Sequence, residues 1–190
     1  MQPEEVLLDV DGVLCDFIPP CLDIIYELTG QRFTNDEFDM WDVIAHLRQR
    51  LGHQVMNAVA HRIKAEGFCL SLPLLPGAQE GVEKLRSVAG RLHIVTSPWD
   101  GPHWEAERVE WLRKHFGFKR RDIIQTHSKD IIDGDIIIDD KITTLKKWVD
   151  RRPHKHAVLW HTPHNRFDAD PRIQRHANWD QLIETYFGRQ

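Results

Sequence analysis

Cysteine is scarce in this sequence and is not arranged in pairs. The 190 residues include three cysteines, Cys15, Cys21 and Cys69, and none of them forms a C-x-x-C pair. An odd number of separated cysteines argues against a disulfide framework and against a structural zinc site. We therefore expect a protein of a reducing, cytoplasmic compartment.

Long apolar runs and a strong excess of charge are also lacking. No stretch approaches the roughly eighteen apolar residues of a membrane span, and the acidic start at residues 1–5 has no signal-peptide pattern. The formal net charge is only −4, which gives no support for an extended nucleic-acid surface. We expect no membrane partner and no extended nucleic-acid surface, and the basic cluster at 119–121 is interpreted as a solvated turn.

Short apolar runs alternate with amphipathic segments along most of the chain. The predicted strands cover about 4–9, 91–97, 122–125, 135–139 and 156–160. Helices are predicted at about 78–88, 103–115 and 141–151, and from Trp179 after an Asn178 cap. Apolar strands that alternate with helices indicate a parallel sheet covered on both sides. The predicted fold class is α/β, a Rossmann-like parallel sheet with helices on both faces.

The segment at 18–72 carries helical patterns and no convincing strand. A helix is predicted over about 21–29. Thr34 and Glu37 have the spacing of a capping box, which predicts that an amphipathic helix begins there. A further helix is expected at about 53–65. The segment is therefore predicted to be a helical insertion after the first strand.

Two carboxylates end the first strand. Asp9 and Asp11 follow an apolar run, and a side-chain period of two starts them from the same face of the strand. Gly12 lets the chain turn sharply beside them. Two carboxylates that are held close repel each other unless a cation lies between them or one takes up a proton. The pair therefore predicts a divalent metal site.

Polar residues also stand at the ends of later strands. They are Thr96 and Ser97, Lys129, and the pair Asp139 and Asp140. Each has an ordinary explanation when taken alone, as a turn, a solvated lysine or a helix cap. In a parallel sheet, however, the carboxyl ends of the strands share one edge, and ligands bind in the crevice beyond it. We expect these residues and the first-strand carboxylates to line one crevice.

The chemistry that suits this crevice is phosphoryl transfer. A phosphate monoester carries about two negative charges near neutral pH, so a carboxylate attacks it only when cations offset the repulsion. Lys129 would supply one cation. The hard carboxylate oxygens favour Mg²⁺ over zinc as the other.

The motifs and their order resemble those of the haloacid dehalogenase (HAD) superfamily of phosphatases. The matching stretches are Asp9-Val10-Asp11-Gly12-Val13, Thr96-Ser97, Lys129 and Asp139-Asp140. The resemblance implies that Asp9 is the nucleophile that forms an aspartyl-phosphate, and that Asp11 is the general acid and base. Thr96 and Lys129 would hold the phosphoryl oxygens. An Asp at position 11, where dehalogenases carry an aromatic residue, argues for phosphatase chemistry.

The same resemblance implies a Mg²⁺ site. Its ligands would be Asp9, the backbone carbonyl of Asp11 and a carboxylate of the last motif. Alignment of the strand end with that motif favours Asp140 as the direct ligand and Asp139 as its support.

Within the superfamily, the sequence most resembles the 5'(3')-deoxyribonucleotidases. The resemblance rests on Asp-Gly-Val-Leu-Cys-Asp-Phe, on Thr-Ser-Pro and on the helical insertion between these motifs. It implies a HAD-like catalytic core at 1–17 and 73–190 and a small helical cap at 18–72. Phe17 would stack on the base, Ser97 would contact phosphate or substrate, and Trp41 is either a second wall of the base pocket or part of the cap core.

Two other functions stay open at this point. The first is a HAD phosphatase that acts on a phosphosugar, another small phosphate ester or a nucleic-acid end. The second is a phosphoacceptor signalling domain, which also places acidic residues and a lysine at strand ends but in a different order. The expected partner is a small phosphate ester, with a nucleoside monophosphate favoured, and a homodimer is one of the assemblies that the sequence allows.

Four histidines gather near the last predicted strand. They are His154, His156, His161 and His164. Their number suggests a transition-metal cluster, but no acidic residue is spaced with them, so exposed or otherwise satisfied histidines are favoured. The segment at 160–166 is expected to border the crevice as a substrate contact.

Overall fold

The computed structural model describes residues 3–188, and its centre is a six-stranded sheet in the order β3-β2-β1-β4-β5-β6. The strands are β1 Glu5–Leu8, β2 Arg91–Thr96, β3 Ile123–Gln125, β4 Ile136–Asp139, β5 His156–Trp160 and β6 Ile173–His176. Each neighbouring pair is parallel. The predicted parallel α/β fold is therefore confirmed.

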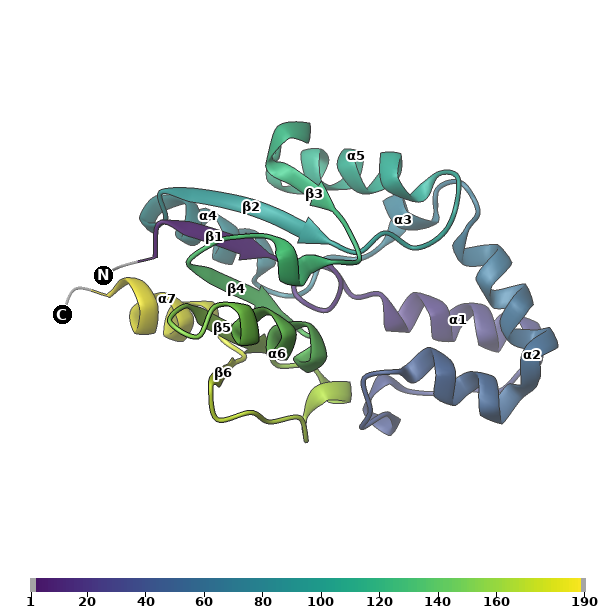
Figure 1. The fold of residues 1–190 in the computed structure, drawn as a ribbon. Coiled ribbons are helices and arrows are strands. Elements are labelled where there is room, and N and C mark those ends of the chain that lie inside the picture. The colour runs from purple at the N-terminus through teal and green to yellow at the C-terminus, as the bar shows by residue number, and fades with distance from the viewer. Residues whose placement is uncertain (1–2, 189–190) are drawn as a thin grey trace.

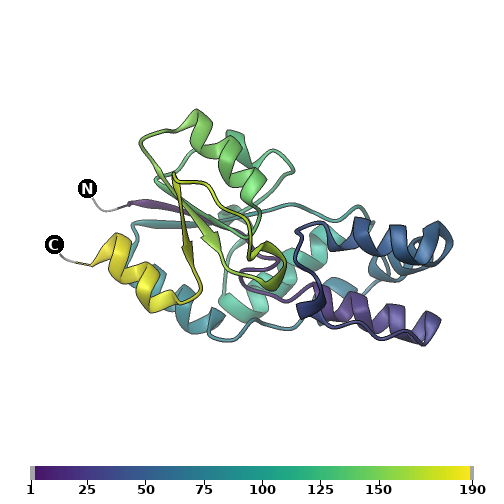
Figure 2. The same ribbon diagram turned by 90° about the horizontal axis from the view of Figure 1, so that it is seen from below.

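Helices cover both faces of the sheet, as Figure 2 shows. One face carries α4 Ala78–Val88, α5 Trp104–Phe116 and α7 Trp179–Phe187, and the other carries α6 Ile142–Arg151. The strands are apolar on both sides because alternate residues serve different layers. In β1, for example, Leu8 lies in the cluster under α4, α5 and α7, and Leu7 lies in the cluster under α6.

The sequence-based expectation missed the edge strand β6. Its sequence, Ile173-Gln174-Arg175-His176, has one apolar residue, and none of the four is fully buried. A half-exposed edge strand lacks the apolar run by which central strands are recognised. Its position is set by pairing with β5, where Ala157 lies opposite Ile173.

The segment between β1 and α4 is helical, and its main helices lie beyond the edge to which the arrowheads of β1 and β2 point (Figure 1). It contains α1 Ile18–Thr29, a 3₁₀ turn at Asn35–Glu37, α2 Val43–Ile63 and the short α3 Phe68–Ser71. None of the helices described in residues 3–188 has both the length and the apolarity that a bilayer crossing requires.

The expected helix start at Thr34 is wrong. The Thr34 N–H does donate to Glu37 at 2.7 Å, but the turn that this contact closes is a single 3₁₀ turn. Helix α2 begins only at Val43, where the Asp42 carboxylate accepts the N–H of Ala45 at 2.9 Å. Gly52 interrupts α2 as expected, because its φ of 83° and ψ of 166° are not helical.

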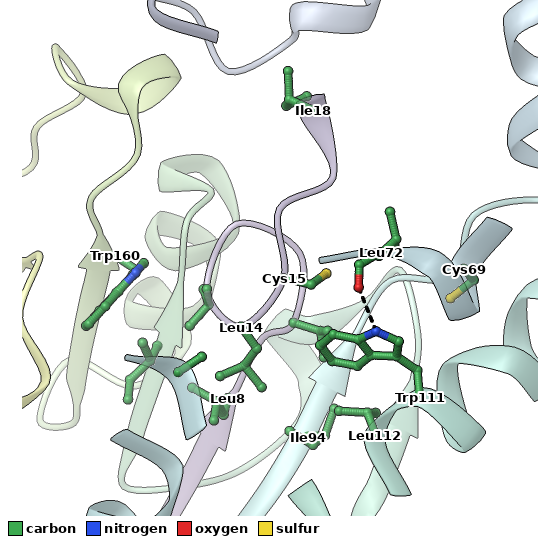
Figure 3. Close-up of a cluster of buried hydrophobic side chains, with 14 of the residues drawn as sticks. Leu8, Leu14, Cys15, Ile18, Cys69, Leu72, Ile94, Trp111, Leu112 and Trp160 are labelled. Carbon is green, nitrogen blue, oxygen red and sulfur yellow. Dashed lines mark hydrogen bonds between the residues drawn. The ribbon is translucent and has the colours of Figure 1, made fainter. Parts of the chain in front are cut away.

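One buried apolar cluster runs from the sheet into the helical segment. Figure 3 shows its centre, where Trp111 of α5 packs beside Leu72 and Cys15. The Trp111 indole N–H donates to the Leu72 carbonyl at 2.9 Å, which satisfies the buried polar atom of the ring. This contact fixes α5 against the chain that returns from the helical segment to the sheet.

Candidate active site

Four segments meet at the carboxyl edge of the sheet. Asp9 follows β1, Thr96 ends β2, and Asp139 and Asp140 stand at the end of β4. The register that pairs Leu8 with both Ile94 and Ile138 brings these three strand ends level. Lys129 begins a 3₁₀ turn after β3.

Lys129 links the first and fourth strands at this edge. It is buried, and its Nζ lies 2.6 Å from Asp9 Oδ2 and 2.8 Å from Asp139 Oδ2. Burial by itself would lower the pKa of the ammonium, but the two carboxylates raise it above its ordinary value. Lys129 is therefore a fixed positive charge, and the ordinary alternative of a solvated lysine is wrong.

Asp9, Asp139 and Asp140 form a buried group in which one carboxylate oxygen of each lies within 4.8 Å of the others. It is the one such three-ligand group found in the described part of the chain. Burial raises the pKa of Asp9 well above its ordinary value. Lys129 opposes this shift, whereas the neighbouring carboxylates add to it. Three carboxylates thus face one ammonium, so the cluster is short of positive charge.

Position 12 requires glycine, because the backbone turns there with a positive φ and passes close to the carboxylate cluster. Its φ is +76°, a conformation that favours glycine. A Cβ at this position would lie 2.2 Å from Asp140 Oδ2. The Asp140 carboxylate therefore packs directly on the turn that follows Asp9 and Asp11.

The two carboxylates of the last motif have different partners. Asp139 uses both oxygens within the protein, because Oδ2 accepts from Lys129 and Oδ1 accepts the Lys141 N–H at 2.8 Å. Asp140 Oδ2 instead lies 3.1 Å from His164 Nε2. Burial raises the pKa of Asp140, and the hydrogen bond with His164 opposes that shift.

The sequence interpretation placed His164 only within the 160–166 segment that was expected to border the crevice, and it did not predict the contact with Asp140. The acidic partner of His164 is 24 positions away, so no local spacing indicated it. His164 is buried and hydrogen-bonded, which agrees with the interpretation of a satisfied histidine. Asn165 supports the same contact, because its side-chain amide donates to the Asp140 carbonyl at 2.8 Å and to the Trp160 carbonyl at 2.8 Å. The other histidines of the segment, at 154, 156 and 161, are exposed.

The two hydroxyls at the end of β2 differ. Thr96 is fully buried, and its Oγ1 has no hydrogen-bond partner within residues 3–188. Ser97 is half-buried and donates to the Thr126 carbonyl at 3.2 Å. A buried hydroxyl without a partner is costly, so Thr96 Oγ1 is the better candidate for contact with a ligand.

The side chain of Asp11 turns away from the carboxylate cluster. Its Oδ1 lies 2.7 Å from Arg108 NH2 and accepts the Cys15 thiol at 3.1 Å. Arg108 is on α5 and is fully buried. No sequence pattern indicated this arginine, because a charged residue on a predicted helix is usually exposed at the surface.

The aromatic candidates lie in different surroundings. Phe17 is half-buried and packs against Phe68, Trp99 and Trp104, with the Trp99 ring centroid at 5.3 Å. Trp41 is 38% exposed, and Lys141 Nζ lies 3.6 Å from its ring centroid. The alternative of Trp41 as cap core is therefore wrong. The Lys141 contact joins the helical segment to the end of β4.

Comparison with known proteins identifies the family of this chain. A family model for cytosolic type C 5'-nucleotidases that act on deoxy (pyrimidine) nucleotides matches residues 4–187. The chain belongs to this family. It is thus an enzyme, a phosphatase of the HAD nucleotidase type, and the resemblance stated from its motifs is confirmed. The signalling-domain alternative is set aside.

A relative and two solved structures illustrate the similarity. The human cytosolic-type 5'(3')-deoxyribonucleotidase is 29% identical over 203 residues, with 96% of this chain and 94% of that protein covered. A HAD-like hydrolase from Streptococcus pneumoniae has a TM-score of 0.65 at 15% identity, over 96% of this chain and 98% of the other. A magnesium-bound HAD hydrolase from Bacillus subtilis has a TM-score of 0.60 at 17% identity, over 98% and 99%. At such identities the structures support the fold alone.

Proposed function

We propose that the chain is a Mg²⁺-dependent 5'(3')-deoxyribonucleotidase that works through a phosphorylated Asp9. The observation that carries the proposal is the cluster in which buried Asp9 meets Lys129, Asp139 and Asp140 beside the unpartnered hydroxyl of Thr96. Family membership supports the substrate class, as does the name of the human relative.

The donor set suits a hard divalent cation. Its oxygens come from three carboxylates that lie close together, and one lysine does not balance their charge. We assign direct contact to Asp9, Asp140 and the Asp11 carbonyl, as the motif resemblance implies. Asp139, whose oxygens accept from Lys129 and from the Lys141 N–H, would support them. The Bacillus subtilis hydrolase, which shares the fold, was solved with magnesium bound. When bound, Mg²⁺ would offset the charge of the phosphoryl group.

The reaction follows from the remaining groups. An Asp9 oxygen attacks phosphorus, the bond from phosphorus to the leaving oxygen breaks, and Asp11, which enters this step protonated, gives that oxygen its proton. Lys129 and the Thr96 hydroxyl hold phosphoryl oxygens, with Ser97 nearby. Asp11 then takes a proton from water, whose oxygen attacks phosphorus and frees Asp9. The products are a nucleoside and inorganic phosphate.

The helical segment at 18–72 would act as a cap, with residues 1–17 and 73–190 as the catalytic core. Phe17 would stack on the base, since its aromatic neighbours hold the ring in place while part of it stays exposed. Trp41 would form a second wall at the rim, where Lys141 holds it. The segment at 160–166, which contacts Asp140 through His164, would border the substrate.

A substrate panel tests the proposal. Deoxyribonucleoside and ribonucleoside 5'- and 3'-monophosphates are compared with sugar phosphates at fixed Mg²⁺, by release of inorganic phosphate. We expect a higher kcat/KM for the nucleotides. If sugar phosphates are hydrolysed as well as the nucleotides, the nucleotidase assignment fails and the phosphatase chemistry survives. Activity that a chelator does not reduce would contradict the metal dependence.

A further inference from the structure

Arg108 is the most deeply buried charge near the site outside the carboxylate cluster. It is 0% exposed and lies on α5, between the rings of Trp104 and Trp111 at 5.0 and 5.6 Å from its Cζ. A buried guanidinium is costly unless it is paired and hydrogen-bonded. Its ionic partner is Asp11, at 2.7 Å.

The contact with Asp11 belongs to a closed arrangement. Arg108 NH2 donates to Asp11 Oδ1, Arg108 NH1 donates to Cys15 Sγ at 3.4 Å, and the Cys15 thiol donates to the same Oδ1 at 3.1 Å. Both side-chain contacts of Asp11 thus fall on one oxygen. A carboxylate that is held at Oδ1 has its rotamer fixed, and Oδ2 is the oxygen left for proton exchange.

Helix α5, which carries Arg108, is itself held against the returning chain. The Glu107 carboxylate accepts the N–H groups of Gly67 at 2.6 Å and Cys69 at 3.1 Å, next to α3. Trp111 holds the Leu72 carbonyl, as Figure 3 shows beside Cys15. These contacts hold α5 in place, so the position from which the Arg108 side chain reaches Asp11 is fixed by the neighbouring chain.

We propose that Arg108 is a positioning residue, which holds the Asp11 carboxylate so that Oδ2 faces the leaving oxygen of the substrate. The inference rests on the proposed role of Asp11 as general acid. Arg108 does not touch the substrate and gives up no proton. Its effect is confined to the step in which the bond from phosphorus to the leaving oxygen breaks and that oxygen takes a proton from Asp11.

A positioning role and a purely structural role predict different dependences of the rate on the leaving group. A nucleoside leaves as a poor alkoxide and needs a proton, whereas 2,4-dinitrophenolate leaves readily without one. Since kcat/KM reports the steps up to loss of the leaving group, its dependence on leaving-group pKa measures how well Asp11 donates. The ratio of two kcat/KM values from one preparation also cancels the concentration of folded enzyme.

The experiment compares Arg108→Gln, Arg108→Lys and Glu107→Gln with the unmodified chain. Substrates are a deoxynucleoside monophosphate and a series of alkyl and aryl phosphates, at saturating Mg²⁺. We expect Arg108→Gln to lose about 10²-fold in kcat/KM on the nucleotide and less than about tenfold on 2,4-dinitrophenyl phosphate. Arg108→Lys keeps the charge without the forked donor geometry and should fall between. Glu107→Gln changes a buried residue of the same helix that contacts Gly67 and Cys69 but not Asp11, so it should keep the original leaving-group dependence even if it lowers stability.

An equal loss on all substrates in both Arg108 variants would overturn the inference, since a structural arginine changes the amount of active enzyme and not the leaving-group dependence. Asp11→Asn distinguishes this result from failure of the proposed function. If Asp11→Asn shows the steep dependence and the Arg108 variants do not, Asp11 is the acid and Arg108 does not position it. If Asp11→Asn hydrolyses the nucleotide normally, the parent mechanism itself fails.

Discussion

The carboxylates at the two ends of the parallel sheet have opposite shifts in pKa. At the carboxyl end, Asp9, Asp139 and Asp140 are buried around one lysine, and burial raises the pKa of Asp9 and of Asp140. At the amino end, Asp135 accepts the N–H groups of Glu4 at 2.9 Å and Glu5 at 3.0 Å, and it pairs with Lys155. These contacts, with that of Lys155 the largest, lower the pKa of Asp135 to about 2.

The difference separates a structural carboxylate from a functional group. Asp135 has its charge balanced and its oxygens engaged, so it ties the start of β1 to the start of β4. The cluster at the other end keeps more negative charge than Lys129 offsets, and a neighbouring hydroxyl without a partner. Such an arrangement stabilises the fold poorly by itself and is suited to a cation and a phosphoryl group.

The largest effect is expected from Asp9→Asn. Loss of the nucleophile should lower kcat on the order of 10⁴-fold or more. The fold should persist, because the change removes repulsion from Asp139 and Asp140, and the midpoint of thermal unfolding in the presence of a chelator should stay the same or rise. Phosphate release and thermal unfolding measure the two effects. Retained turnover would rule out Asp9 as the nucleophile.

Lys129→Met should affect both activity and stability. Asp9 and Asp139 would lose their shared ammonium, which for a buried pair costs about 3–5 kcal/mol in the free energy of unfolding. Urea denaturation in a chelator measures this loss, and saturating Mg²⁺ should recover part of it. The surface pair Lys84 and Asp180 supplies the control, since Lys84→Met should change stability by less than about 1 kcal/mol. An equal effect of the two substitutions would remove the contrast between buried cluster and surface pair.

Thr96→Val should separate activity from stability. The hydroxyl has no partner in the described structure, so its removal should leave the free energy of unfolding unchanged or higher. If it contacts a phosphoryl oxygen, its loss should lower kcat/KM by about 10- to 100-fold. Ser97→Ala is the comparison, since it removes a hydrogen bond to Thr126 that exists without ligand. A destabilised Thr96→Val with normal kcat/KM would contradict the assignment.

Trp41→Ala tests the rim of the crevice. If the ring is a wall of the base pocket, KM for nucleoside monophosphates should rise about tenfold while KM for aryl phosphates changes little. Tyr26→Ala is a matched control, because Tyr26 is also exposed on the helical segment and lies 4.0 Å from Arg32 Cζ. It should leave both constants unchanged. Equal effects of the two substitutions on KM would leave Trp41 with no role in base binding.

The smallest effect is expected from Asp135→Ala, and it should concern stability alone. Loss of the hydrogen bonds to β1 should cost about 1 kcal/mol at neutral pH. Because the pKa of Asp135 is lowered to about 2 in the folded protein, this contribution is present above about pH 4 and is lost as the pH falls toward 2. Chemical denaturation of both proteins across this range measures it. Asp23→Ala, at an exposed site on α1, is the control and should change the free energy of unfolding by less than about 0.5 kcal/mol. A change in kcat/KM in Asp135→Ala would contradict a purely structural role for Asp135.

The sequence by itself determined the parallel α/β fold and, through the resemblance of its motifs, the phosphatase class. Apolar strands alternating with helices have few other solutions, and four polar strand ends in one order identify the phosphatase type. Residues that lie at strand ends, such as Asp9 and Thr96, were accessible to this reasoning because strand direction and register suffice to bring them together.

Only the tertiary structure decided which other side chains meet these residues. His164 reaches Asp140 across 24 positions and Arg108 reaches Asp11 across 97, and neither separation has a periodicity that a sequence pattern could reveal. The capping box at Thr34 and Glu37 satisfied its local rule yet closed only one turn. Local hydrogen bonds and periodicity set short elements, whereas contacts between distant elements depend on how the whole chain packs.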